Sequence, residues 1–212
     1  MENKPKRNKG KSLLYFPKSY VVVDIETTGT VCDYEHITEI GAYKVKGGVT
    51  ESFDELVDPG VMLNDFIINL TGITNEMLEG KPHIREVIPA FYNFVEDLPI
   101  IGHNVNFDIN LLYDAVKYEM DEDLNNDFVD TLRMSKRLHP EFSHHKLMNL
   151  AQYYGVDYTG AHRAINDCKI TANCFECMRG EVVWKYGSLE NFYIEIGAVK
   201  KIKKKITKAQ PP

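Results

Sequence analysis

Cysteines and long apolar runs are scarce in this 212-residue sequence. It contains four cysteines, and a disulfide scaffold of this size would be unusual. No apolar run approaches the ~20 residues that span a membrane. The apolar run that follows the basic start, Leu13–Phe16, is too short for the core of a secretory signal. We therefore expect an intracellular, cytoplasmic protein with no membrane partner.

The cysteine pair Cys174 and Cys177 has the C-x-x-C spacing found in zinc and redox sites. No second Cys or His pair stands at zinc-finger spacing, and the pair lies late in a helical pattern, so we interpret both as small buried residues. The sequence also lacks internal repeats and low-complexity linkers. It predicts one domain over residues 19–180, preceded by a basic flexible arm (1–18) and followed by a C-terminal extension (181–212) with a Lys-rich tail.

Charge is unevenly distributed along the chain. Residues 1–18 carry six Lys or Arg and one Glu, and residues 200–212 carry six Lys and no acid. The whole sequence has 25 Lys or Arg and 31 Asp or Glu, for a formal net charge of −6. This leaves 13 basic and 30 acidic residues between positions 19 and 199. Basic terminal arms are common nucleic-acid contacts, although solubilising tails have the same composition. An acidic body can still bind a polyanion where bound cations supply the positive charge.

Strand and helix patterns alternate along the chain, and this order predicts an α/β fold. We expect a mixed five-stranded sheet flanked by helices: an antiparallel meander over residues 20–26, 37–45 and 49–57, and further strands at 99–102 and 127–131. Helices are expected at residues 84–98 with a kink or end at Pro89, at 106–120, after a Ser143 cap, and at 163–178. Residues 69–74 are expected to form a loop that ends in a helix cap at Thr74.

The first strand of this pattern ends in two carboxylates, Asp24 and Glu26. Because side chains alternate along a strand, both carboxylates project from the same face. Adjacent like charges are unfavourable without a cation between them. Mg²⁺ is usually held by one or two carboxylates together with substrate phosphates. The pair therefore suggests a metal site, although taken alone it also fits an exposed acidic turn.

Two further carboxylates stand near predicted helix beginnings, Asp108 and Asp167. Each alone fits a residue that stabilises a helix dipole or faces solvent. Together with Asp24 and Glu26 they could converge at one end of a sheet, and four carboxylates can hold two metal ions ~3.5–4 Å apart that clamp a phosphodiester. His162 would then accept the proton of the attacking water, since histidine exchanges protons near neutral pH.

These motifs resemble those of the DEDD exonuclease family, in the branch whose third motif carries histidine (DEDDh). The three motifs read Asp24-Ile25-Glu26-Thr27-Thr28-Gly29, His103-Asn104-x-x-Phe107-Asp108 and His162-Arg163-Ala164-x-x-Asp167. Intermediate segments of the family are matched at residues 70–74, 129–131 and 145–147. The likeness covers about Tyr20 to Met178, and the chain is similar to the epsilon proofreading subunit of bacterial DNA polymerase III and to exonuclease domains of bacterial replicative polymerases.

The resemblance implies a ribonuclease H-like fold and a 3′→5′ exonuclease that releases nucleoside 5′-monophosphates from DNA, in proofreading or repair. It implies two Mg²⁺ or Mn²⁺ ions held by Asp24, Glu26, Asp108 and Asp167, with His162 as general base. The implied substrate contacts are Thr27, Thr28, Thr71, Gly72, Ile73, His103, Asn104 and Phe107. The Asn104 and Phe107 region lines the path of the next nucleotide in related enzymes, but Phe107 fits helix packing equally well.

The implied partners are nucleic acid with a free 3′ end, single-stranded or frayed DNA foremost, and a DNA polymerase if the enzyme is a proofreader. Two alternatives stay open from the sequence. The first keeps the chemistry but trims RNA, since discrimination depends on contacts to the 2′-OH that a sequence does not locate. The second keeps the fold without catalysis, as a docking module for nucleic acid or a polymerase. The intact set of four carboxylates and a histidine argues against it.

Overall fold

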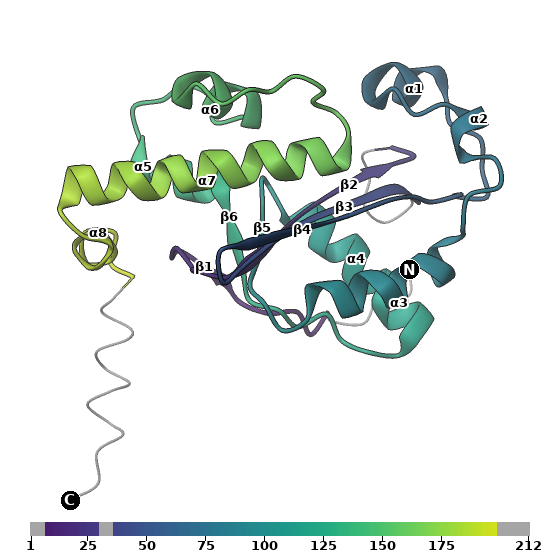
Figure 1. Cartoon of the computed structure of the whole chain (residues 1–212), viewed down its shortest axis with the longest axis horizontal. Coiled ribbons are helices and arrows are strands. Elements are labelled where there is room, and N and C mark those ends of the chain that lie inside the picture. Colours follow the sequence, from purple (N-terminus) through teal and green to yellow (C-terminus); the bar gives the residue numbers. More distant parts are fainter. Residues whose placement is uncertain (1–6, 30–35, 199–212) are drawn as a thin grey trace, which may run out of the picture.

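A six-stranded mixed sheet lies at the centre of the computed structural model, which describes residues 7–29 and 36–198 (Figure 1). The strands are β1 (Ser12–Leu13), β2 (Tyr20–Thr27), β3 (Ile37–Lys46), β4 (Val49–Leu56), β5 (Ile100–Gly102) and β6 (Phe128–Asp130). Their spatial order is β1-β6-β5-β2-β3-β4. The strands β2, β3 and β4 are antiparallel neighbours, whereas β5 runs parallel to both β2 and β6. The predicted α/β fold with a meander and parallel strands is confirmed.

The sheet has one strand more than the five predicted from the sequence. β1 pairs in parallel with β6, with Ser12 opposite Phe128 and Leu13 opposite Val129. A two-residue strand has no apolar alternation of its own, and this one exists because it fills the free backbone positions of β6. Asp127 adds a side-chain contact, since its Oδ1 accepts the Lys11 backbone N–H at 2.8 Å.

Helices cover both faces of the sheet (Figure 1). They are α1 (Asp65–Thr71), α2 (Asn75–Leu78), α3 (Ile84–Val95), α4 (Asn106–Met120), α5 (Thr131–Leu138), α6 (Leu147–Tyr154), α7 (Ala164–Tyr186) and α8 (Leu189–Glu195). None of the helices in the described part of the chain is long and apolar enough to cross a membrane.

The alternation of β2 divides the core into two layers. Val21 and Val23 pack with α3 and α4 on one face of the sheet. Tyr20 and Val22 pack on the other face with α7, including Phe175. Asp24 continues the alternation of Tyr20 and Val22, so it projects toward the layer that contains α7. A side chain from α7 can therefore lie next to Asp24.

Several predicted helix boundaries were wrong. Residues 69–71 belong to α1, which ends at Gly72 in a left-handed conformation (φ 71°). α7 continues beyond Met178 to Tyr186, because the apolar stripe that faces the body extends to the buried Val182. The residue that precedes α6 is Lys146 and not Ser143, and α3 passes through Pro89. The cap at Thr74 is confirmed, since its side chain accepts the Met77 N–H.

The segment from Arg7 to Lys18, part of the expected basic arm, contacts the body of the protein. Arg7 Nε and Nη2 donate to the two carboxylate oxygens of Asp114 at 2.7 and 2.6 Å. Phe16 is buried and its ring lies 4.9 Å from that of Phe175. Residues 1–6 and the Lys-rich tail of residues 199–212 lie outside the described residues.

Candidate active site

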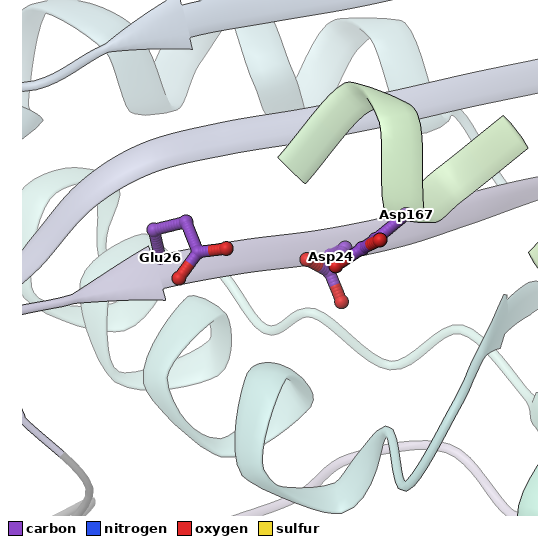
Figure 2. Close-up of side chains that lie close together, drawn as sticks. All are labelled: Asp24, Glu26 and Asp167. Atoms are coloured by element: carbon purple, nitrogen blue, oxygen red, sulfur yellow. The ribbon is translucent and has the colours of Figure 1, made fainter. Parts of the chain in front are cut away.

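Three of the four predicted carboxylates lie close together at the end of β2. One carboxylate oxygen from each of Asp24, Glu26 and Asp167 lies within 4.8 Å of the other two. Asp24 and Glu26 project from β2, and Asp167 reaches them from the first turn of α7 (Figure 2). All three side chains are partly buried. The strand alternation therefore brings the two β2 carboxylates to the layer where α7 begins.

The fourth predicted carboxylate, Asp108, approaches β2 from the other layer. It lies in the first turn of α4 and is buried. Its Oδ1 accepts the backbone N–H of Ile25 at 3.2 Å, between the two β2 carboxylates in sequence. Burial raises the pKa of Asp108 to about 7, in spite of this hydrogen bond, which lowers it. Asp108 is thus adjacent to the cluster of three but not a member of it.

Mutual repulsion and burial make the carboxyl groups of the cluster weak acids. Burial first, and then the charges of Asp108, Asp167 and Glu26, raises the pKa of Asp24 well above its usual range. Burial, followed by the charges of Asp167 and Glu39, raises the pKa of Glu26 to about 8. Burial also raises the pKa of Asp167. In the absence of a cation, the fold therefore holds these carboxylates in an unfavourable arrangement.

The donor set fits a divalent metal ion. Asp167 Oδ1 is buried and has no hydrogen-bond partner in the described part of the chain, while Oδ2 accepts the His162 backbone N–H at 3.3 Å. An unpaired buried carboxylate oxygen beside other carboxylates costs free energy unless a cation neutralises it. All donors at the site are carboxylate oxygens, which are the ligands preferred by hard ions such as Mg²⁺ and Mn²⁺.

The beginning of α7 is fixed on β3 by Gly41 and Glu39, and sequence reasoning did not identify either residue. A Cβ atom at Gly41 would lie 2.4 Å from the carbonyl carbon of Ala164, so only glycine permits this close approach. Glu39 is fully buried, and its Oε2 accepts the Ala164 backbone N–H at 2.8 Å. Because Asp167 lies in the first turn of α7, these two contacts set its position against β2. Neither contact has a local sequence signal.

His162 precedes α7 and has an exposed side chain. Its backbone is in the left-handed region (φ 69°), which a residue other than glycine rarely adopts. The backbone N–H of His162 donates to Asp167, so the tight turn that holds His162 is tied to the cluster. The turn therefore holds the His162 backbone against Asp167 and leaves the side chain exposed.

A pocket of about 360 Å³ opens beside the cluster. It contains seven of the predicted site residues together with four others, and is lined by Ile25, Glu26, Thr27, Gly29, Ile67, Leu70, Thr71, His103, Asn104, Phe107 and Asp108. Of the four others, Ile67 and Leu70 come from α1. Leu70 begins the 70–74 segment matched to the family, although it was not among the predicted contacts, and Ile67 precedes that segment and was not singled out. An apolar wall next to carboxylates is the character of a ligand site.

Three predicted substrate contacts do not line this pocket. Ile73 is fully buried in a small apolar cluster with Ile67 and Leu78, so its side chain serves packing. Gly72 is the left-handed cap of α1. The Thr28 hydroxyl accepts the His36 backbone N–H at 3.0 Å. These residues shape the segments around the pocket.

His103 and Asn104 are held in the pocket wall by the start of α5. Thr131 Oγ1 donates to the Gly102 carbonyl oxygen, so the hydroxyl can accept the Nδ1–H of His103 across 2.9 Å. Burial lowers the pKa of His103 to about 4, so the ring is neutral at physiological pH. The Asn104 backbone N–H donates to Asp130 Oδ1 at 2.9 Å. These contacts tie the turn between β5 and α4 to the start of α5.

The mixed sheet with carboxylates at the end of its central strand defines the class of protein, a ribonuclease H-like α/β fold with an acidic cluster at that strand end. The family model named RNase T and described as "Exonuclease" matches residues 21–175. The chain belongs to this exonuclease family.

Comparison with curated relatives shows how much of each protein corresponds to this chain. The DNA polymerase III subunit epsilon of Aquifex aeolicus is 35% identical over 188 residues, which are 88% of this chain and 93% of that protein. The PolC-type DNA polymerase III of Lacticaseibacillus paracasei is 38% identical over 169 residues, which are 79% of this chain but only 12% of that protein. The chain therefore corresponds to nearly all of an epsilon subunit and to a small part of a PolC polymerase.

A solved structure shares the fold at lower sequence identity. Escherichia coli exonuclease I in complex with a dA16 oligonucleotide aligns with a TM-score of 0.67 at 19% identity, over 83% of this chain and 42% of that chain. The fold described above is therefore that of a known nuclease.

Proposed function

We propose that this chain is a divalent-metal-dependent 3′→5′ exonuclease that removes nucleotides from DNA ends as nucleoside 5′-monophosphates. One observation carries the proposal: carboxylates of Asp24, Glu26 and Asp167 gather within 4.8 Å beside a pocket of about 360 Å³. Membership of the exonuclease family and the similarity to an epsilon subunit along most of its length support the direction of cleavage and the choice of DNA.

The proposed metal ligands are Asp24, Glu26, Asp108 and Asp167, holding two Mg²⁺ or Mn²⁺ ions. Such ions, when bound, acidify the attacking water and stabilise the leaving oxygen of a phosphodiester. Asp24 is the proposed shared ligand, because the charges of both Asp108 and Asp167 act on it. Asp108 keeps one oxygen on the backbone of β2 and so has its other oxygen for coordination.

His162 is the proposed general base. Its side chain is exposed, and its backbone is tied to Asp167. A ring nitrogen of His162 would accept the proton of the attacking water as the oxygen bonds to phosphorus. The fixed turn before α7 would keep the ring next to the carboxylates through successive cycles, so that each new 3′ end meets the same geometry.

The proposed pocket for the 3′-terminal nucleotide is formed by Thr27, Thr71, His103, Asn104 and Phe107. Because its walls combine an aromatic ring with hydroxyl and amide groups, it can hold a base and a sugar without selecting one base. A single-stranded or frayed end would enter most easily. The similarity to the epsilon subunit supports a proofreading role beside a polymerase.

The test is a panel of matched DNA and RNA oligonucleotides labelled at the 5′ end, each with Mg²⁺, Mn²⁺ or EDTA. We expect a ladder of 5′-labelled products that shortens from the 3′ end, faster on DNA than on RNA and absent in EDTA. Mass spectrometry of the small products should show deoxynucleoside 5′-monophosphates. Faster shortening of RNA would replace the proposed substrate, and early release of the 5′ label would contradict the direction of cleavage.

A further inference from the structure

An exposed apolar surface on α1 continues the wall of the pocket. Phe66 is 67% exposed and Leu70 is 42% exposed, whereas the neighbouring Ile67, which also lines the pocket, is buried. Residues four apart share one helix face, so Phe66 lies about one turn, roughly 6 Å along the axis, from Leu70. Leu70 itself lines the pocket. Phe66 thus extends the same apolar surface outward.

The charge of this region limits what can bind to it. Residues 58–81, which include α1 and α2, carry the four acids Asp58, Asp65, Glu76 and Glu79, and Lys81 is their one base. Phosphate groups would be repelled from such a surface. An uncharged flat group would not be, and a nucleobase has a face that stacks on aromatic rings in a sequence-tolerant way.

We propose that Phe66, together with Leu70, is a stacking platform for a base on the 5′ side of the terminal nucleotide. The proposal rests on the proposed exonuclease function and deepens it, because it assigns a contact for a second nucleotide. A DNA strand seated there would turn its bases toward α1 and its phosphates away from the acids of residues 58–81. The platform would favour single-stranded ends, since the bases of a duplex are already stacked and paired.

The test compares two substrates, the p-nitrophenyl ester of thymidine 5′-monophosphate, which fills only the terminal pocket, and dT oligonucleotides of two to six residues. Phe66→Ala should raise the KM for the oligonucleotides at least about 5-fold, with no change for the nitrophenyl ester. Phe66→Trp keeps an aromatic ring and should therefore have the KM of the wild type for the oligonucleotides. Tyr118→Ala is the matched control, because Tyr118 is an aromatic residue that is 86% exposed on α4 and does not line the pocket.

An oligonucleotide KM of Phe66→Ala equal to that of the wild type would reject the platform while leaving the exonuclease function intact. An equal loss on the nitrophenyl ester would also reject it, since the defect would then lie in the terminal pocket. Failure of the wild-type protein to digest any DNA would instead contradict the proposed function. If Phe66→Ala does not fold, Phe66→Leu keeps the apolar bulk without the ring and should show the same selective rise in KM.

Discussion

Glu39 and Arg163, which are 124 positions apart in the sequence, form an ion pair that docks the start of α7 on β3. Arg163 Nε and Nη2 donate to Glu39 Oε1 at 2.9 and 2.5 Å. Glu39 is completely buried, but the Arg163 side chain remains 35% exposed. The pair is therefore asymmetric, and this asymmetry leads to a prediction about its two partners.

Loss of Arg163 should cost more stability than loss of the Glu39 charge. Arg163→Met leaves a buried carboxylate without its cation, and we expect the free energy of unfolding to fall by about 3 kcal/mol. Glu39→Gln leaves a guanidinium that can turn to water, so it should cost less than half as much. Urea unfolding in EDTA measures both. Lys117→Met, which removes an exposed pair with Asp121, is the control and should change stability by less than about 1 kcal/mol. Equal losses at Glu39 and Arg163 would contradict the asymmetry.

Gly41→Ala should displace α7 and reduce catalysis. The added methyl group would lie 2.4 Å from the Ala164 carbonyl carbon, so the helix must shift or the core must strain, at a cost of about 1–3 kcal/mol. The kcat should fall with it, because Asp167 moves with the helix. Gly180→Ala on the same helix meets no atom within 4 Å and should be neutral or stabilising, by up to about 1 kcal/mol. A fully active, fully stable Gly41→Ala protein would show that the close approach does not matter.

Asp24→Asn should abolish activity and yet stabilise the metal-free protein. Asp24 is repelled by Asp108, Asp167 and Glu26, and an amide removes this repulsion. We expect kcat to drop by at least about 100-fold, the scale on which loss of one electrostatic group acts. Thermal unfolding in EDTA should show a higher Tm than that of the wild type. The exposed Asp54 on β4 supplies the control variant Asp54→Asn, which should keep full activity.

Stability of the metal-free protein should depend on pH through Glu26. Its folded pKa of about 8 lies above the ordinary glutamate value of 4.5, so between these pH values the folded protein holds a proton that the unfolded chain releases. The contribution of Glu26 to stability is therefore present at low pH and is lost as pH rises toward 8. Relative to Glu26→Gln, the wild type should lose stability across this window in EDTA, and Mg²⁺ should abolish the loss. A constant difference between the two proteins would contradict the raised pKa.

The sequence predicted the parts of the fold and site that local pattern determines. The strand over Tyr20–Thr27 follows from its β-branched run, and the shared face of Asp24 and Glu26 follows from strand alternation. Asp108 and Asp167 stand at helix beginnings as predicted, and three carboxylates converge. The motif resemblance supplied the expectation that segments so distant in the chain meet at one site.

The remainder depends on contacts between distant segments, for which no local pattern exists. β1 has two residues and forms only because β6 offers a pairing edge. In the sequence, Glu39 has the pattern of an ordinary strand residue. Its buried carboxylate is explained by the ion pair with Arg163, which is distant in the sequence. Phe66 and Leu70 are apolar but exposed, so α1 does not have the simple pattern of a buried apolar face and an exposed polar face. One of its faces borders the pocket. The hydrogen bond from the Ile25 backbone N–H to Asp108 joins residues 83 positions apart, and no local pattern predicts it.

Asp24, Glu26 and Asp167 are proposed to hold the divalent ion on which catalysis depends. Electron paramagnetic resonance of a Mn²⁺ titration tests it directly, by counting the free ion in the presence of the wild type, Asp24→Asn and Asp167→Asn. We expect saturable binding to the wild type and at least about a 10-fold weaker affinity in each variant, a loss of ~1.4 kcal/mol. Binding of Mn²⁺ with the same stoichiometry and affinity to all three proteins would contradict it.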